Sequence, residues 1–90
     1  MSIKKLKIGV IGSTGSVGKT SLKIFKEYKN QFSVEFLVCD ENSKEIIKQI
    51  ETYSPRYAFI NNINAYNTVR LIKFKKKVIF FNNFLLFKKN

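Results

Sequence analysis

Three of the four glycines in this 90-residue chain fall within seven consecutive residues, 12–18, which read Gly-Ser-Thr-Gly-Ser-Val-Gly. Residues 3–11 before them hold an apolar run, rich in β-branched side chains, that is typical of a strand buried on both faces and comprises Leu6, Ile8, Val10 and Ile11. After them, apolar residues recur at helical spacing with lysines on the other side. The expected apolar face of this helix comprises Val17, Ser21, Leu22, Phe25 and Tyr28. The glycines therefore join a strand to a helix.

The same alternation continues along the chain. Residues 32–39 have the composition of a second strand and residues 57–60 that of a third. Between them, Asn42 or Ser43 can cap a helix whose apolar face comprises Ile46, Ile47, Ile50 and Tyr53. Strands that alternate with helices through short connections form a parallel sheet. We therefore expect an α/β fold: a Rossmann-like parallel sheet with flanking helices, equivalent to the first half of a doubly wound dinucleotide-binding domain.

Beyond Asn61 the pattern weakens, because the asparagine pairs favour neither helix nor strand. Residues 65–72 are compatible with a short third helix and residues 77–81 with a fourth strand. The last residues contain only Lys, Phe, Asn, Leu, Ile and Val, and an exposed segment 84–87 would promote aggregation. We predict a dinucleotide-binding unit over residues 1–72 and a basic, aromatic, low-complexity tail over residues 73–90.

Composition excludes several kinds of site. Histidine is absent and Cys39 is the only cysteine, which excludes a zinc site, a His-based catalytic dyad and an internal disulfide. The net charge of +11 comes mainly from lysines spread along the chain, the pattern of solvated surfaces, although a basic nucleic-acid-binding protein remains an alternative. No segment reaches the roughly 20 apolar residues of a membrane span, and the first apolar run is too short for a signal peptide. We expect a cytoplasmic protein.

The glycine turn admits three interpretations. Gly18, Lys19 and Thr20 look like the end of a nucleoside triphosphatase P-loop, but the glycine that should begin that motif lies one residue too early. The glycines could also make a structural turn without a ligand, at a conformational cost of up to about 1 kcal/mol each. The third interpretation is a phosphate site, in which backbone N–H groups and the hydroxyls of Ser13, Thr14 and Ser16 donate to phosphate oxygens. The strand before the turn and the helix after it favour this third interpretation.

With its flanks, the turn resembles a known family. Residues 8–18, Asn42 after the second strand, Gln49 in the second helix and residues 54–57 are similar to the 1-deoxy-D-xylulose 5-phosphate reductoisomerase family, with a close match over residues 5–60. Aspartate-semialdehyde dehydrogenases have similar turns, but Asn42 and Gln49 together with Pro55 favour the reductoisomerases.

The resemblance implies an NADPH-dependent oxidoreductase of non-mevalonate isoprenoid biosynthesis. Members convert 1-deoxy-D-xylulose 5-phosphate to 2-C-methyl-D-erythritol 4-phosphate with Mg²⁺ or Mn²⁺, and we expect the intact enzyme to be a homodimer without nucleic-acid or membrane partners. The family's catalytic and metal-binding residues lie beyond residue 90, so we assign none and expect this fragment to be inactive alone. The expected cofactor-binding residues are Gly12, Thr14, Gly15, Ser16, Val17 and Asn42. A stand-alone nucleotide-binding module without catalysis is an alternative.

One segment departs from the family. Where members typically have Ala-Gly-x-Asn, often with a basic residue at x, this chain has Cys39-Asp40-Glu41-Asn42. In dinucleotide-binding folds a carboxylate about 20 residues after the turn favours a free ribose 2′-OH and repels a 2′-phosphate. We therefore predict a weakened preference for NADPH. The other interpretation is that Asp40 and Glu41 are solvated residues before a helix.

Overall fold

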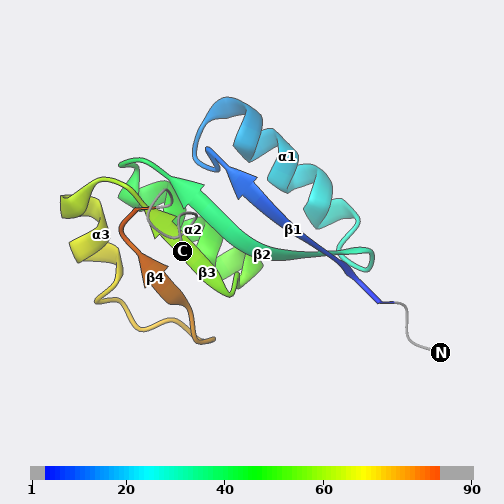
Figure 1. Ribbon diagram of the computed structural model, residues 1–90. Helices are drawn as coiled ribbons and strands as arrows, with labels where there is room; N and C mark the ends of the chain where they lie inside the picture. The colour runs from blue at the N-terminus through cyan, green and yellow to red at the C-terminus, as the bar shows by residue number, and fades with distance from the viewer. Residues whose placement is uncertain (1–3, 84–90) are drawn as a thin grey trace.

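The computed structural model describes residues 4–83, which form one four-stranded parallel sheet with three helices (Figure 1). The strands lie in the order β1-β2-β3-β4, and each neighbouring pair is parallel. Segment 84–87, which we expect to promote aggregation if exposed, lies outside the described residues. In chain order the elements are β1 (Leu6–Ile11), α1 (Ser16–Glu27), β2 (Phe32–Cys39), α2 (Ser43–Tyr53), β3 (Tyr57–Ile60), α3 (Ile63–Val69) and β4 (Ile79–Phe81).

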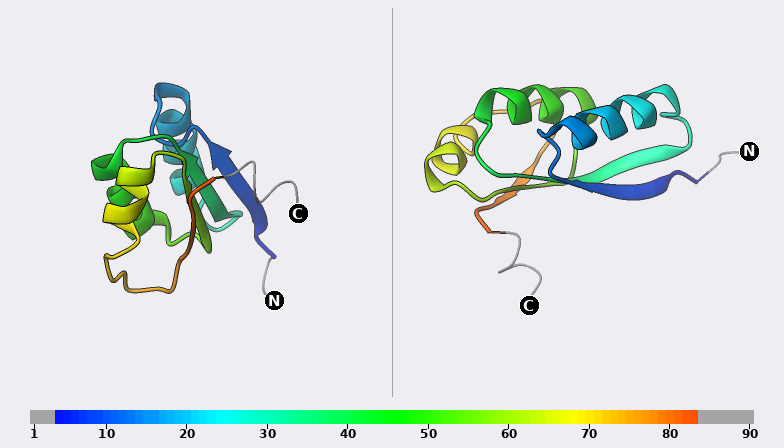
Figure 2. Two further views of the ribbon diagram at one scale, coloured as in Figure 1. Left: turned by 60° about the vertical axis from the view of Figure 1, so that its left-hand side comes forward. Right: turned by 90° about the horizontal axis from the view of Figure 1, so that it is seen from above.

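Helices α1 and α2 lie on the same face of the sheet (Figure 2). The core between them and the sheet is built from branched aliphatic side chains, among them Leu22 of α1, Ile46 and Ile50 of α2, and Leu37 of β2, each at most 1% exposed. The adjacent, parallel order of β1, β2 and β3 is that of the first half of a doubly wound sheet. The predicted α/β, Rossmann-like class is therefore confirmed.

The segment after Asn61 is more regular than the sequence suggested. The predicted third helix, 65–72, is displaced: α3 begins at Ile63 because the side chain of Asn62 accepts a hydrogen bond from the Ala65 N–H at 3.0 Å. The asparagine that weakened the pattern is thus the helix cap. The fourth strand is shorter than the predicted 77–81 and pairs with β3 over Ile79–Phe81. The division of the chain at residue 72 stays a prediction.

The expectation that the first strand is buried on both faces is wrong. Only Val10 of β1 is buried, whereas Leu6 and Ile11 are 63% and 67% exposed. Among residues 4–83, β1 has a single neighbouring strand, β2, and therefore forms an edge of the sheet (Figure 1). Its composition is that of a central strand, but its position leaves one side open.

The face of the sheet opposite the Val10 side chain carries a row of aromatic rings. Gly9 of β1 lies beneath the ring of Phe36, which occupies the space that a Cβ at position 9 would need. Phe36 meets Phe59 edge-on at 5.9 Å between ring centroids, and Phe59 stacks on Phe81 at 5.0 Å. Because neighbouring side chains of a strand point to opposite faces, this row lies opposite the helices.

The beginning of α1 packs against the turn through Gly18. A Cβ added to Gly18 would overlap the carbonyl oxygen of Gly12 and the backbone of Ser13. The buried face of α1 therefore starts at Gly18 and continues through Leu22, while Val17, predicted for this face, is 81% exposed. Helical spacing alone did not distinguish these neighbours, because glycine carries no side chain to mark it as part of an apolar face.

We predict that Gly18→Ala lowers the free energy of unfolding by about 1 to 3 kcal/mol, since the new methyl group overlaps backbone that cannot move aside easily. Urea unfolding of the 90-residue chain, followed by circular dichroism, measures the change. Gly15→Ser is the matched control: its Cβ would meet only the Gly12 oxygen, at 3.4 Å, and serine is a good N-cap residue. Equal stability of wild type and Gly18→Ala would contradict the packing described here.

Candidate functional site

The turn that follows β1 is held by backbone hydrogen bonds. The N–H groups of Gly12 and Ser13 both donate to the carbonyl oxygen of Val38, at 2.8 and 2.9 Å, and the N–H of Gly15 donates to the carbonyl oxygen of Gly12 at 3.0 Å. Gly12 has φ +72°, in the left-handed region that favours glycine. The turn is thereby fixed at the carboxyl end of β1, beside the end of β2.

The N-terminus of α1 is free of side-chain caps. Gly15 is its N-cap residue, and within the described part of the chain no side chain caps this helix and no acidic residue lies in its first turn. By contrast, Asn42 caps α2 and Asn62 caps α3. The first N–H groups of a helix have no acceptor inside it and carry partial positive charge. The start of α1 therefore offers donors to an anion from outside.

The side chains of the turn differ in their access to such an anion. Ser16 and Val17 are exposed and Thr14 is half-buried, whereas Ser13 is completely enclosed. The suggestion that the Ser13 hydroxyl donates to a ligand is therefore wrong for this conformation. Its backbone is anchored to Val38 and the side chain is drawn into the interior with it.

The second segment expected to bind a cofactor lies next to the turn. Cys39 ends β2, and because β1 and β2 are parallel neighbours, the residues that follow them share the carboxyl edge of the sheet. The N–H groups of Asn61 and Asn62 donate to the carbonyl oxygens of Cys39 and Asp40, at 3.1 and 2.8 Å, which fixes the backbone of this segment.

The four side chains of this segment face different surroundings. Asp40 and Glu41 are exposed, whereas Cys39 is buried. Burial, and secondly the charge of Asp40, raise the pKa of the Cys39 thiol to about 12, so this cysteine is protonated and unreactive near neutral pH. The side chain of Asn42 accepts a hydrogen bond from the Glu45 N–H at 3.1 Å and so caps α2. Turn and segment together form a polar rim along one edge of the sheet.

A buried side chain joins this rim to α2. Gln49 is 3% exposed, and its Nε2 donates to the carbonyl oxygen of Ser13 at 2.8 Å and to Oε2 of Glu45 at 3.2 Å. Sequence reasoning had noted Gln49 only as a point of family resemblance. The available signal was a polar residue directly before Ile50 in the apolar face of a helix.

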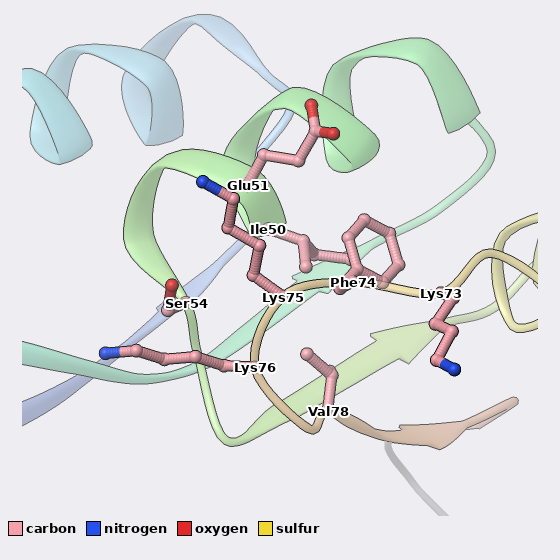
Figure 3. A pocket seen from close by; sticks show the side chains of 8 residues that line it. All are labelled: Ile50, Glu51, Ser54, Lys73, Phe74, Lys75, Lys76 and Val78. Carbon is pink, nitrogen blue, oxygen red and sulfur yellow. The ribbon is translucent and has the colours of Figure 1, made fainter.

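The hollow drawn in Figure 3, of about 380 Å³, belongs to another part of the molecule. It lies between the C-terminal turn of α2 and the segment 73–78, and its apolar lining is Ile50, Phe74 and Val78. Helices of a parallel β-α-β unit run opposite to the strands, so the end of α2 lies at the edge of the sheet away from the glycine turn. The side chains of Lys73, Lys75 and Lys76, which line this hollow, point in different directions and do not converge on one point (Figure 3).

Two further features of the described part of the chain bear on the site. Within residues 4–83, no group of three or more His, Cys, Asp or Glu residues is placed to hold a metal ion. None of the helices in this range has the length and apolar character needed to cross a membrane.

The chain is similar to known proteins over most of its length. Residues 8–83 match the family model described as 1-deoxy-D-xylulose 5-phosphate reductoisomerase. The reductoisomerase of Pelagibacter ubique (strain HTCC1062) is 38% identical over 79 residues, covering 87% of this chain and 20% of that protein. The enzyme of Buchnera aphidicola subsp. Schizaphis graminum (strain Sg) is 43% identical over 56 residues, covering 62% of this chain and 14% of that protein.

A solved structure has the same fold. It is described as 1-deoxy-D-xylulose 5-phosphate reductoisomerase from Zymomonas mobilis in complex with NADPH, and it superposes with a TM-score of 0.76 at 20% identity over 87% of this chain and 21% of that one. The matched part of the chain thus covers between 14% and 21% of the length of these three relatives. Because the family model covers most of the sequence, including the turn, α2 and β3, the chain belongs to the 1-deoxy-D-xylulose 5-phosphate reductoisomerase family.

Proposed function

We propose that the rim formed by the glycine turn and the segment after β2 binds NADPH, with the pyrophosphate at the start of α1. The observation that carries this proposal is the uncapped N-terminus of α1, which follows a turn whose backbone is already fixed. Backbone N–H groups and the helix dipole at such a position favour a phosphate group. The NADPH in the related Zymomonas mobilis structure supports the choice of ligand.

The residues of the rim would act in different ways. The N–H groups of Thr14, Gly15, Ser16 and Val17 surround the start of α1, although that of Gly15 already donates to Gly12. Gly12 supplies the left-handed conformation that turns the chain. The exposed side chain of Val17 offers an apolar contact beside the phosphate site, and Asn42 orders the segment next to the adenosine ribose by capping α2.

The chemistry of the whole enzyme follows from the family. When bound to the whole enzyme, NADPH would supply the hydride for the reduction that follows rearrangement of 1-deoxy-D-xylulose 5-phosphate and gives 2-C-methyl-D-erythritol 4-phosphate, with Mg²⁺ or Mn²⁺ assisting. We propose that the present residues contribute only the binding of the cofactor, and that the sugar-phosphate, metal and dimer contacts belong to the rest of a longer cytoplasmic enzyme. The alternative of a nucleic-acid-binding protein is not favoured, because the family match accounts for most of the chain.

Gly15→Asp tests the phosphate site without removing the fold. Position 15 has room for a side chain, and an aspartate at an N-cap accepts hydrogen bonds from the first turn of the helix. We expect the thermal midpoint to stay the same or rise, while affinity for NADPH falls at least about tenfold, because a fixed negative charge competes with the phosphate. Calorimetric titration measures the affinity.

Gly15→Asn is the matched control, since asparagine caps the helix equally well without the charge. It should weaken binding less than Gly15→Asp does. Saturable binding by a folded Gly15→Asp chain with wild-type affinity would contradict a phosphate site at the start of α1.

The acidic residues of the second segment give a prediction about cofactor choice. We expect the wild-type chain to bind NADPH less than about tenfold more tightly than NADH, because Asp40 and Glu41 repel a 2′-phosphate. Glu41→Lys, which restores the basic residue often found in the family, should raise the ratio of the two affinities. Glu27→Lys makes the same change of charge at the far end of α1 and should leave the ratio unchanged. A wild-type preference for NADPH above tenfold would contradict the role given to these carboxylates.

A further inference from the structure

We infer that Gln49 is a positioning residue for the cofactor turn: its side-chain amide fixes the peptide between Ser13 and Thr14 so that the turn presents its N–H groups outward. This inference rests on the proposed binding of NADPH and concerns a residue that does not reach the rim itself. Gln49 lies in the middle of α2, 36 positions from Ser13, and its Nε2 reaches the Ser13 carbonyl oxygen at 2.8 Å in a buried hydrogen bond.

The direction of the Thr14 N–H follows from the geometry of the peptide unit that it shares with the Ser13 carbonyl. In a planar trans peptide the carbonyl and the N–H point in opposite directions. The Ser13 carbonyl points inward to Gln49, so the N–H of Thr14, which belongs to the same peptide, points away from Gln49. Rotation of this peptide would break the bond to Gln49 and turn the Thr14 N–H away from its place beside the first turn of α1. The amide of Gln49 therefore selects one orientation of the donor that precedes the helix.

A chain of hydrogen bonds connects the segment after β2 to the turn after β1. The Oδ1 atom of Asn42 accepts from the Glu45 N–H at 3.1 Å, and the side chain of Glu45 accepts from Gln49 Nε2 at 3.2 Å. Gln49 Nε2 also donates to Ser13. The two parts of the rim, one after β1 and one after β2, are thus connected through the first two turns of α2. A shift of Asn42 and the start of α2 would therefore be transmitted to the turn through these hydrogen bonds.

The side chain of Gln49 has two opposing effects on the stability of the core. Gln49 Oε1 and the hydroxyl oxygen of Ser13 are both buried, and neither has a hydrogen-bond partner among the described residues. A buried acceptor without a partner destabilises the folded state. An apolar side chain of similar size would remove the unpaired Oε1 but would leave the Ser13 carbonyl without its buried donor. The amide thus leaves one buried atom unpaired while it pairs another, and its clear effect is to orient the turn. Affinity and stability should therefore respond to Gln49 in different ways.

The test compares Gln49→Met with Ile50→Val in the complete 90-residue chain. Methionine fills a similar volume without a donor. Valine at position 50, which is 1% exposed, loosens the core from the neighbouring position of α2. We expect Gln49→Met to bind NADPH about tenfold less tightly in calorimetric titration, equivalent to about 1.4 kcal/mol. Ile50→Val should bind within about twofold of wild type although it is less stable.

A second measurement separates this inference from the proposed function. In nitrogen-15 spectra of the chain without cofactor, Gln49→Met should shift the amide resonance of Thr14, and Ile50→Val should leave it in place. Unchanged affinity and an unchanged Thr14 amide in Gln49→Met would overturn the inference. If wild type itself binds no cofactor, the proposed function fails, and the Thr14 amide alone then decides: a selective change supports positioning of the turn by Gln49, and no change overturns it.

Discussion

The contact of Gly18 with the backbone of Gly12 and Ser13 is the constraint on which the rest of this site depends. Because position 18 has no side chain, the first turn of α1 approaches the end of β1 more closely than any other residue would allow. This approach puts the uncapped start of the helix beside the turn, in which Ser13 is buried. Once Ser13 is inside, its carbonyl needs a buried donor, and Gln49 supplies it. One missing Cβ thus links the packing of the helix to the orientation of the turn.

Much of the architecture could be predicted from the sequence, because it depends on local patterns. The alternation of apolar strands with amphipathic helices was sufficient to predict the parallel order of β1, β2 and β3. The cap of α2 was narrowed to Asn42 or Ser43, both common N-cap residues, and the hydrogen bond from the Glu45 N–H identifies Asn42. Asn62 plays the same role for α3, but in a run of asparagines the pattern was too weak to identify the capping residue.

The parts that could not be predicted depend on contacts between distant segments. Helical spacing put Val17 on the buried face, whereas the close approach of Gly18 turns Val17 to the outside. The hydrogen bond from Gln49 to Ser13 spans 36 positions and leaves no periodic signal. The exposure of Leu6 and Ile11 also depends on distant segments. The composition of β1 is that of a central strand, and a central strand of a doubly wound sheet has neighbours on both sides. In residues 4–83, β1 has a neighbour on one side only.

We propose that the edge of the sheet at the start of α1 is the cofactor site, in place of the hollow at the other end of α2. Titration of the nitrogen-15-labelled chain with NADP⁺, followed by amide chemical shifts, tests this claim most directly. We expect saturable shifts at Thr14, Gly15, Ser16 and Val17 and in residues 40–42, with little change in residues 73–78. Shifts concentrated in residues 73–78, with the turn unaffected, would contradict it.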